Sequence, residues 1–479
     1  MSTAIVWFRR DLRVADHAAL NAALAAHEAV VPVYIHAPEE EAPWAPGAAS
    51  RWWLGHSIEA LARRLEACGS PLVVRRGPSL EALLALCGST GATAVYWQRV
   101  YEPGLAARDA RVAAALEADG VRVVPCPGAL LIEPQVVLSR AGTPYRVFSA
   151  YWKAWHARLS VPSTLPAPKR LPAPARPPSG VAPADLGLAP GHAWADGLQA
   201  RWEVGEEAAN RRLDAFCRDA LEDYPAARDR PGTDGVSGLS PHLHFGELSP
   251  RQLWHAVQSI GERGGAASRS GAESFLRQLA WREFAAYVLH HWPQTDSRPM
   301  DRRFDRFPWR TDYGELLRRW QQGRTGYPMV DAGMRELWRT GWMHNRARML
   351  TASFLVKNCR IPWQEGARWF WDTLVDADLA NNSLGWQWVA GTGVDAAPYF
   401  RIFSPIRQGE RFDPEGAYVR RWLPELARVP DRWVHQPWVG DEGGSRHRAW
   451  DARGYASRMV DFDLSRREAL AAHRQLRSG

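Results

Sequence analysis

Several features that define other protein classes are absent from this 479-residue sequence. No stretch approaches the ~20 apolar residues that a membrane-spanning helix needs, and no basic segment followed by an apolar one marks a signal peptide. The five cysteines lie far apart and form no CxxC pair, which argues against a structural zinc site or a four-cysteine iron–sulfur cluster. Their odd number and wide spacing are typical of a reducing compartment. We therefore expect a soluble, cytoplasmic protein without a metal site.

Lysine is also scarce: it occurs only at Lys153, Lys169 and Lys357, so arginine supplies 57 of the 60 basic residues. Arginine binds phosphate in a planar, two-pronged way that lysine cannot reproduce, although a GC-rich genome would produce the same bias. The formal net charge of +8 permits a polyanionic partner without requiring one. Tryptophan, in contrast, is abundant. The 25 residues suggest ring stacking or electron transfer, unless a tryptophan-rich helical core accounts for most of them.

The first 130 residues alternate between short apolar runs and amphipathic stretches. The pattern predicts strands at 4–8, 30–35, 72–74, 94–97 and 121–124, and helices at 51–67 and 105–118. Strands that alternate with helices predict a parallel α/β sheet. No GxGxxG follows the first strand, so a dinucleotide site is not supported there.

The rest of the chain changes character twice. Residues 161–190 are rich in proline, which cannot sustain a helix or a strand ladder, so they are expected to form a surface connector. From residue 202 onward the pattern is helical, with helices predicted at 275–291, 327–339 and 345–356. The predicted parts are an α/β domain at 1–130, a proline-rich interdomain linker at 131–200 and an all-α domain at 201–479.

The first candidate site is the segment Ser237–Ser249, with the sequence SGLSPHLHFGELS. Ser240 is a good N-cap, and Pro241 suits the first turn of a helix. A helix start rich in hydroxyl and free N–H groups can hold phosphate. An ordinary capped helix would show the same residues.

Two further segments combine polar and aromatic side chains. On a helix, Gln278 shares a face with Trp281 and Arg282, which could hold a heteroaromatic ligand or form a surface patch beside a buried indole. Asn345 lies one turn before Arg348 and Met349, a set that suits a polar ring edge and a phosphate.

The last candidate segment runs from Asp376 to Trp388, with the sequence DADLANNSLGWQW. Buried carboxylates are costly without partners, so Asp376 and Asp378 should be paired, and Arg348 is a natural partner. A structural ion pair explains the two carboxylates as well as a cofactor site does.

Together these segments resemble the photolyase/cryptochrome family over essentially the whole chain. The matching motifs, in family order and spacing, are WFRRDLR at 7–13, the SGLSP segment, WREF at 281–284, TGYPMVDAGMR at 325–335, GWMHNRARM at 341–349, DADLANNSLGWQW at 376–388 and APYFRIF at 397–403. The resemblance implies an α/β domain with a five-stranded parallel doubly wound sheet, able to hold an antenna pigment. A long proline-rich linker would join it to an all-α domain holding one U-shaped FAD. The implied protein is a monomer that binds UV-damaged DNA.

The resemblance also implies roles for individual residues. The implied FAD contacts are Tyr224, Val236, Ser237, Gly238, Leu239, Ser240, Phe275, Arg282, Arg348, Asp376, Asp378 and Asn382. The implied lesion and DNA contacts are Arg228, Gln278, Trp281, Asn345, Arg346, Met349 and Trp388. Asn382 would lie next to flavin N5 and favour the reduced flavin. Trp386, Trp363 and Trp309 match the chain of tryptophans that carries electrons from the surface to the flavin.

The activity implied by the family is light-driven repair of cyclobutane pyrimidine dimers. Photoexcited reduced FAD would donate an electron to a dimer flipped out of the duplex, and neither an acid–base pair nor a metal is required. The alternative is a cryptochrome-type blue-light photoreceptor with weak or no repair activity. Asn382, Trp281, Asn345 and Met349 favour the enzyme, whereas Gln278 favours the photoreceptor.

Three positions depart from the family pattern. Gln278 replaces a glutamate usual in cyclobutane-dimer photolyases, so we expect slower splitting of the dimer without loss of binding. Val236 replaces a threonine of the flavin-phosphate segment, so FAD should bind less tightly. Leu105 stands where some bacterial photolyases carry a folate-binding glutamate. A methenyltetrahydrofolate held differently, a deazaflavin and no antenna therefore all remain open.

Overall fold

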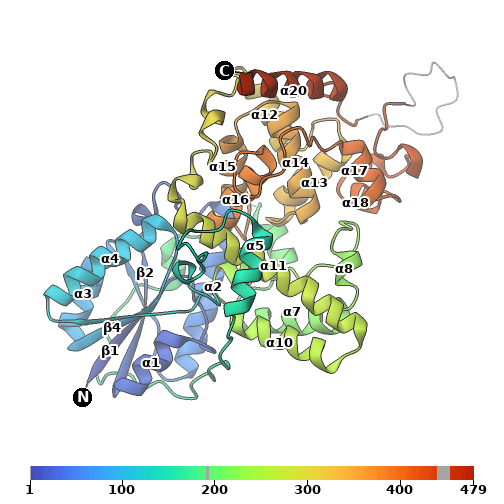
Figure 1. The fold of residues 1–479 in the computed structure, drawn as a ribbon. Helices are drawn as coiled ribbons and strands as arrows, with labels where there is room; N and C mark the ends of the chain where they lie inside the picture. Colours follow the sequence, from blue (N-terminus) through green and yellow to red (C-terminus); the bar gives the residue numbers. More distant parts are fainter. Residues whose placement is uncertain (1, 190–193, 440–453, 479) are drawn as a thin grey trace. The chain divides into compact units, whose positions relative to one another are not determined.

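The computed structural model describes residues 2–189, 194–439 and 454–478 (Figure 1). Its contacts divide the chain into two compact units. Unit 1 comprises Met1–Glu222, Ser237–Pro293 and Val375–Leu379, and unit 2 comprises Asp223–Val236, Gln294–Leu374 and Ala380–Gly479. Each unit is therefore assembled from segments that are distant in the sequence. Among the described residues, no helix has the length and apolar character needed to cross a membrane.

Unit 1 contains a parallel five-stranded sheet with the strand order β3–β2–β1–β4–β5. The strands are β1 (Thr3–Phe8), β2 (Ala29–His36), β3 (Val73–Arg76), β4 (Ala92–Gln98) and β5 (Arg122–Cys126). Ile5 of the central strand pairs with Val31 on one side and Val95 on the other. The central strand β1 is buried along its whole length because both faces of a doubly wound sheet are covered, whereas the edge strands β3 and β5 carry Arg75, Arg76 and Arg122. The predicted sheet is confirmed.

Helices cover both faces of this sheet (Figure 1). They are α1 (Ala18–Ala26), α2 (Ala48–Ala67), α3 (Ser79–Thr90) and α4 (Pro103–Ala118). Leu83 of α3 and Leu116 of α4 are buried in one core cluster with Trp7 and Trp97 of the strands. Leu20 of α1 is buried as well, and α1 lies on the opposite side of the strands from α3 and α4 (Figure 1).

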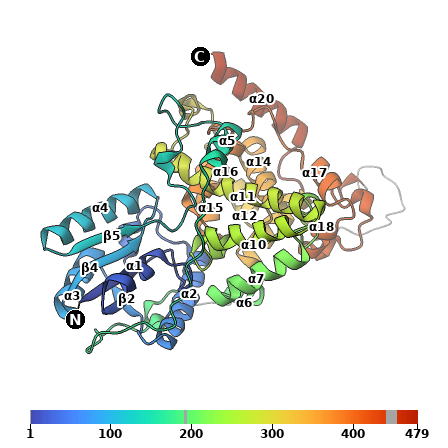
Figure 2. The same cartoon turned by 60° about the horizontal axis from the view of Figure 1, so that its bottom comes forward.

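The remainder of unit 1 consists of helices and irregular segments. Its helices are α5 (Phe148–Arg158), α6 (Ala195–Arg201), α7 (Glu206–Asp219), α9 (Ser240–His244), α10 (Pro250–Arg263) and α11 (Ala266–His291), with short 3-10 turns η1 (Pro38–Glu41), η2 (Pro134–Val136), η3 (Pro183–Leu186). Helices α10 and α11 run side by side (Figures 1 and 2). Residues 161–189 contain neither α-helix nor strand, as their prolines predict, and η3 is the regular turn within them.

A buried aspartate just after the N-terminal WFRRDLR motif joins three segments of unit 1. Asp16 accepts hydrogen bonds from the Ser249 hydroxyl, the Arg251 guanidinium (2.8 Å) and the Leu165 backbone N–H (2.9 Å). Its backbone has a φ of +50°, a conformation that aspartate tolerates better than most residues. The start of the chain is thereby attached to the proline-rich segment and to the start of α10.

The regular secondary structure of unit 2 is entirely helical among its described residues. Its helices are α8 (Tyr224–Ala227), α12 (Gly314–Gln321), α13 (Pro328–Thr340), α14 (Asn345–Ser353), α15 (Trp363–Thr373), α16 (Leu379–Ala390, whose first residue belongs to unit 1), α17 (Pro405–Phe412), α18 (Ala417–Trp422) and α20 (Phe462–Ser478). Short 3-10 turns at η4 (Pro293–Asp296, whose first residue belongs to unit 1), η5 (Arg302–Arg306), η7 (Pro424–Leu426) and η8 (Asp431–Trp433) connect them. The predicted all-α character is confirmed, with one change. The helix expected at 345–356 is α-helical only over α14 (Asn345–Ser353) and continues as a π-helix, η6 (Phe354–Asn358). Such wide turns are rare and often occur at functional sites, and apolar spacing alone does not reveal them.

The TGYPMVD motif forms a buried clamp at the start of α13. The Asp331 carboxylate accepts hydrogen bonds from the backbone N–H groups of Thr325 (2.7 Å) and Gly326 (3.0 Å) and from the hydroxyl of Tyr455 (2.6 Å). Burial raises the pKa of Asp331, while these hydrogen bonds oppose the increase. The Tyr327 hydroxyl donates to the Val460 carbonyl at 2.8 Å. The motif therefore fastens the C-terminal segment of the chain to α13.

Candidate functional site

The residues predicted to form the site are divided between the two units. Unit 1 holds Ser237, Gly238, Leu239, Ser240, Phe275, Gln278, Trp281, Arg282, Asp376 and Asp378, and unit 2 holds Tyr224, Arg228, Val236, Trp309, Asn345, Arg346, Arg348, Met349, Trp363, Asn382, Trp386 and Trp388. In unit 1 four of them lie on α11, and in unit 2 four lie on α14 (Asn345–Ser353) and three on α16.

The segment predicted to hold phosphate turns sharply beside an arginine. Gly238 has a φ of +63°, and a Cβ at this position would lie 2.5 Å from Nη1 of Arg212. Burial and the neighbouring charge of Arg201 lower the pKa of Arg212, whereas Glu203 raises it. A half-buried cation next to a glycine turn suits a phosphate group, since arginine donates to phosphate oxygens.

The capping prediction for this segment was wrong by one residue. Helix α9 starts at Ser240, so Leu239 occupies the N-cap position, and no side-chain capping hydrogen bond forms. The turn at Gly238 brings the chain into the helix earlier than the serine and proline pattern indicates.

Helix α11 carries four predicted site residues on its middle turns. Phe275 packs on Phe216, with ring centroids 4.5 Å apart. The Gln278 amide donates to the carbonyl of Ser274 at 3.1 Å, and Trp281 remains partly exposed. Gln278 and Trp281 thus lie on the same helix, one turn apart, as predicted.

The guanidinium of Arg282 is used within unit 1. It donates to the carbonyls of Ala129 (2.8 Å) and Leu243 (3.5 Å). These contacts connect α11 with the segment after β5 and with α9. Arg282 therefore orients neighbouring backbone in addition to any role toward a ligand.

Asp378 lies close to charged residues from the N-terminal part of unit 1. His244 Nδ1 is 3.5 Å from its carboxylate, and Arg10 interacts with Asp378, Glu102 and Glu41. Burial raises the pKa of Glu102 to about 7, while the charge of Arg10 opposes the increase. Burial also lowers the pKa of His244. The WFRRDLR motif thus reaches a residue of the predicted cofactor site.

In unit 2, helix α16 fixes the orientation of Asn382. Its Nδ2 donates to the carbonyl of Ala367 on α15 at 3.1 Å. Because the amide nitrogen is engaged, the carbonyl oxygen Oδ1 is the group that can accept a hydrogen bond from a ligand N–H. The indole of Trp386 on the same helix is buried and packs edge-on against Phe370 and Trp320.

The other predicted tryptophans differ in exposure. Trp363 is buried at the start of α15. Trp309 is partly exposed and packs against Phe307, with ring centroids 4.5 Å apart. Trp388 packs on Phe403 at 6.5 Å. Trp386 and Trp363 are therefore buried, whereas Trp309 reaches the surface.

Two residues of the GWMHNRARM motif contact each other at the start of α14. The Asn345 amide lies 3.7 Å from the sulfur of Met349. His344 caps the helix by accepting the Arg346 N–H at 3.1 Å, and burial lowers the pKa of His344 to about 4, so the ring is neutral at pH 7. The Arg348 guanidinium donates to the carbonyl of Met343 at 2.7 Å.

The predicted DNA-binding arginines have partners within unit 2. Arg346 forms an ion pair with Asp229 (2.6 Å) and lies over the ring of Phe412. Arg228 lies over the ring of Tyr224. Both arginines are thereby held close to groups that fix their direction before any ligand binds.

Sequence reasoning did not single out Arg212 or Arg10 as site residues, although the structure places them beside the predicted site residues Gly238 and Asp378. Arg10 belongs to a motif that was singled out, but its spacing gave no sign that it approaches Asp378. Arg212 has no sequence signal, because its role depends on the turn at Gly238.

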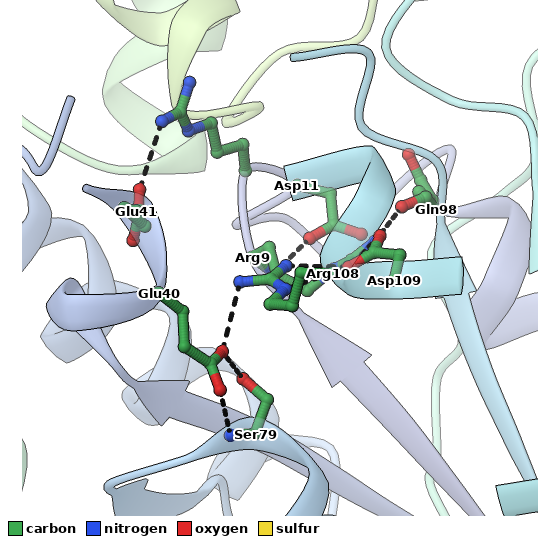
Figure 3. A network of polar contacts seen from close by, with 9 residues as sticks. Arg9, Asp11, Glu40, Glu41, Ser79, Gln98, Arg108 and Asp109 are labelled. Carbon is green, nitrogen blue, oxygen red and sulfur yellow. Dashed lines mark hydrogen bonds and ion pairs between the residues drawn. The ribbon is translucent and has the colours of Figure 1, made fainter. Parts of the chain in front are cut away.

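The carboxyl ends of the central strands carry a dense polar network (Figure 3). Arg9 forms an ion pair with Asp109 (2.8 Å) and lies over the ring of Trp7. Glu40 accepts the Ser79 N–H at 2.8 Å and lies 3.7 Å from Arg108. Open α/β sheets bind ligands where the strand order reverses, which here is between β1 and β4. At this position the chain's own carboxylates neutralise the arginines.

The described residues fit FAD on two independent observations. The half-buried Arg212 beside Gly238 offers positive charge to a pyrophosphate. Asn382 offers an oriented carbonyl oxygen to a ring N–H. No group of three or more histidine, cysteine or acidic side chains suited to a metal occurs among the described residues.

Comparison with known proteins gives two family matches. Residues 4–175 match the model described as DNA photolyase, and residues 275–475 match the FAD binding domain of DNA photolyase. The deoxyribodipyrimidine photo-lyase of Agrobacterium fabrum is 40% identical over 98% of this chain and 97% of that protein. Cryptochrome-1 of Arabidopsis thaliana is 39% identical over 91% of this chain and 65% of that protein. The crystal structure of a class III photolyase from Agrobacterium tumefaciens superimposes with a TM-score of 0.93 at 40% identity, covering 100% of this chain and 98% of that one.

Proposed function

The chain belongs to the photolyase/cryptochrome family and carries its FAD-binding domain, and from this we propose that it is a deoxyribodipyrimidine photo-lyase that repairs cyclobutane pyrimidine dimers in DNA. The observation that carries the proposal is the similarity to bacterial photo-lyases over nearly the whole chain. The orientation of Asn382 supports it.

When bound, FAD supplies the absorption of blue light and the electron that splits the dimer. Arg212 and the Ser237–Ser240 turn would hold its phosphates, with Phe275 packed alongside. The Asn382 Oδ1 would accept a hydrogen bond from the reduced ring. Because this acceptor would favour the N–H form, Asn382 would help to keep bound flavin reduced.

Trp386, Trp363 and Trp309 would bring electrons from the surface. Their graded exposure supports this direction, since the buried indoles are protected and Trp309 is reachable by external reductants.

The lesion would be bound by residues of α11 and α14. Trp281 provides a stacking face, an interaction worth ~1–3 kcal/mol per base. The Gln278 amide can donate a hydrogen bond to a pyrimidine carbonyl but cannot serve as an acid. Arg346 and Arg228 would contact flanking phosphates, so affinity should fall with added salt. We propose that the protein works as a monomer.

A second candidate function is a cryptochrome-type photoreceptor. Gln278 favours it, because the residue removes the acidic group usual in dimer repair, and cryptochromes occur among the relatives. In this function the flavin would be reduced by light without repair of DNA.

Light-dependent repair distinguishes the two. The reduced protein is mixed, without oxygen, with an oligonucleotide that holds one cyclobutane thymine dimer, and thymine absorbance is followed under blue light and in darkness. Recovery under light alone is the expected result. A protein whose FAD is photoreduced but which restores no thymine would be a photoreceptor.

A further inference from the structure

We propose that Phe148 is a positioning residue for lesion binding, which holds the indole of Trp281 in the orientation that stacks on a flipped-out pyrimidine. The inference rests on the proposed function. It assigns a role in DNA recognition to α5, a helix that carries none of the predicted site residues.

The two rings form a close face-to-face stack. The ring centroids of Phe148 and Trp281 are 3.6 Å apart, and the planes differ by 9°. Phe148 is buried, with 2% of its surface exposed, whereas Trp281 remains partly exposed. One face of the indole is therefore covered by protein, and its exposed surface remains available to a ligand.

A third ring restricts the indole from the side. Phe284 meets Trp281 edge-on at 5.8 Å and Phe148 at 5.7 Å. A face contact together with an edge contact restricts rotation about both side-chain torsions of Trp281. The indole is consequently preorganised, and a bound base need not bear the entropy cost of ordering it.

Hydrogen bonds join α11 to α5 and to the segment just before α5. The Trp155 indole N–H donates to the Glu283 carboxylate at 2.9 Å, and the Tyr145 backbone N–H donates to the Tyr287 hydroxyl at 2.7 Å. Glu283 also accepts backbone N–H groups of Leu131 and Ile132.

This arrangement explains the residue types that follow Trp281 on α11. Glu283, Phe284 and Tyr287 are buried and contact α5 or the segment before it. Burial raises the pKa of Glu283 to about 7, and the hydrogen bonds it accepts oppose the increase. The buried Glu283 carboxyl joins α11 to α5 through Trp155. We infer that this link keeps Phe148 of α5 against Trp281 of α11.

The first test replaces Phe148 by leucine and measures binding of the dimer-containing oligonucleotide. The expected dissociation constant is about five- to tenfold higher, since the indole loses its fixed orientation. The repair yield of dimer that is already bound should stay within about twofold of the wild type, because the electron donor is unaltered. Phe148→Tyr, which keeps the stacked ring, should bind as the wild type does. Phe8→Leu, at a buried position of strand β1, is the matched control and should bind as the wild type does.

A double-mutant cycle separates positioning from general damage. If Phe148 acts through Trp281, then Phe148→Leu has no further effect on binding in a Trp281→Leu background. The inference is overturned if the effects of the two substitutions on the dissociation constant multiply. It is also overturned if Phe148→Leu binds the oligonucleotide as tightly as the wild type. Should Phe148→Leu fail to fold, judged by far-ultraviolet circular dichroism and FAD content, Phe148→Met takes its place.

A measurement without DNA keeps this inference distinct from the proposed function. The protein is labelled with 5-fluorotryptophan and its fluorine NMR spectrum is recorded. The resonance that is missing from the spectrum of Trp281→Phe belongs to Trp281. Its shift should move in Phe148→Leu because the neighbouring ring current is lost, and an unmoved resonance overturns the positioning role. If the wild type fails to bind or repair dimers, the proposed function fails while the fluorine result still decides whether Phe148 orients the indole.

Discussion

Gly366 and Trp386 approach each other so closely that no side chain fits between them. A Cβ placed on Gly366 would lie 2.0 Å from Cη2 of the Trp386 indole. Gly366 lies on α15 and Trp386 on α16. The absence of a side chain at position 366 is therefore what allows the first tryptophan of the proposed electron path to occupy its place.

Gly366→Ala should displace this indole. Overpacking of this kind costs about 1–3 kcal/mol of stability. Photoreduction of the bound flavin should also slow several-fold, because the indole moves from its position. The rate of flavin reduction under constant blue light with an external thiol measures the effect, and thermal unfolding measures the stability.

Gly385→Ala is the matched control, since it lies on the same helix as Trp386 and its Cβ would meet no atom within 4 Å. It should leave photoreduction unchanged and raise stability by roughly 0.5–1 kcal/mol, because alanine favours a helix interior more than glycine does. Equal photoreduction rates in both variants would contradict the proposed role of the contact.

Gln278→Glu should raise the yield of dimer splitting several-fold without tightening DNA binding. A carboxyl can serve as a proton donor to the dimer, whereas the amide cannot. The quantum yield of repair at saturating oligonucleotide is the measurement, and the dissociation constant is the control. An unchanged quantum yield would show that this position does not limit repair.

Arg212→Gln should weaken FAD binding about tenfold, the size expected when a charged hydrogen bond to phosphate is lost. Release of FAD on dilution, followed by flavin fluorescence, gives the dissociation constant. Arg211→Gln is the control on the same helix, because Arg211 forms an exposed ion pair with Glu203 (2.6 Å). Similar affinities in the two variants would exclude Arg212 from the phosphate site.

Lys357 should make stability depend on pH. Its ammonium is buried in unit 2 and donates to the Arg401 carbonyl at 2.8 Å. Burial, followed by the charge of Arg401, lowers its pKa from 10.5 to about 7. Between pH 7 and 10.5 the unfolded chain therefore binds more protons than the folded one, so this residue's contribution to stability rises with pH.

The measurement compares the wild type with Lys357→Met. From pH 7 to pH 9 the free energy of unfolding of the wild type should rise by about 2 kcal/mol relative to the variant. Chemical denaturation at several pH values gives both curves. Parallel curves would mean that the buried lysine keeps its ordinary pKa.

The sequence predicted the regular elements well where one pattern dominates. The apolar runs located all five strands to within two residues. The inner strands β1, β2 and β4 are mostly apolar because both of their faces are buried, and the edge strands β3 and β5 still contain a Val-Val pair. The Ser240 cap was misplaced, since the positive φ at Gly238 is invisible in a pattern of hydroxyls and prolines. The π-helix after α14 was missed for a similar reason.

The site was predictable mainly through family resemblance. Motif spacing could place Gln278 and Trp281 on one face of a helix, because both belong to α11. It could not place Phe148 on Trp281 or Arg212 beside Gly238, because these pairs join different helices or loops. Such contacts depend on how elements pack, which a local pattern does not encode.

The clamp at Asp331 has a consequence for the order in which the protein matures on the ribosome. Tyr455 and Val460, which complete the clamp and hold Tyr327, are made more than a hundred residues after the TGYPMVD motif. Until they emerge, a buried carboxylate lacks one of its donors, and burial of an unsatisfied charge is unfavourable. The N-terminal sheet can form before these residues are made, because its strands lie within the first 126 residues. We therefore expect nascent chains to carry a formed sheet while α13 remains open to chaperones, with closure only after residues 455–460 have been made.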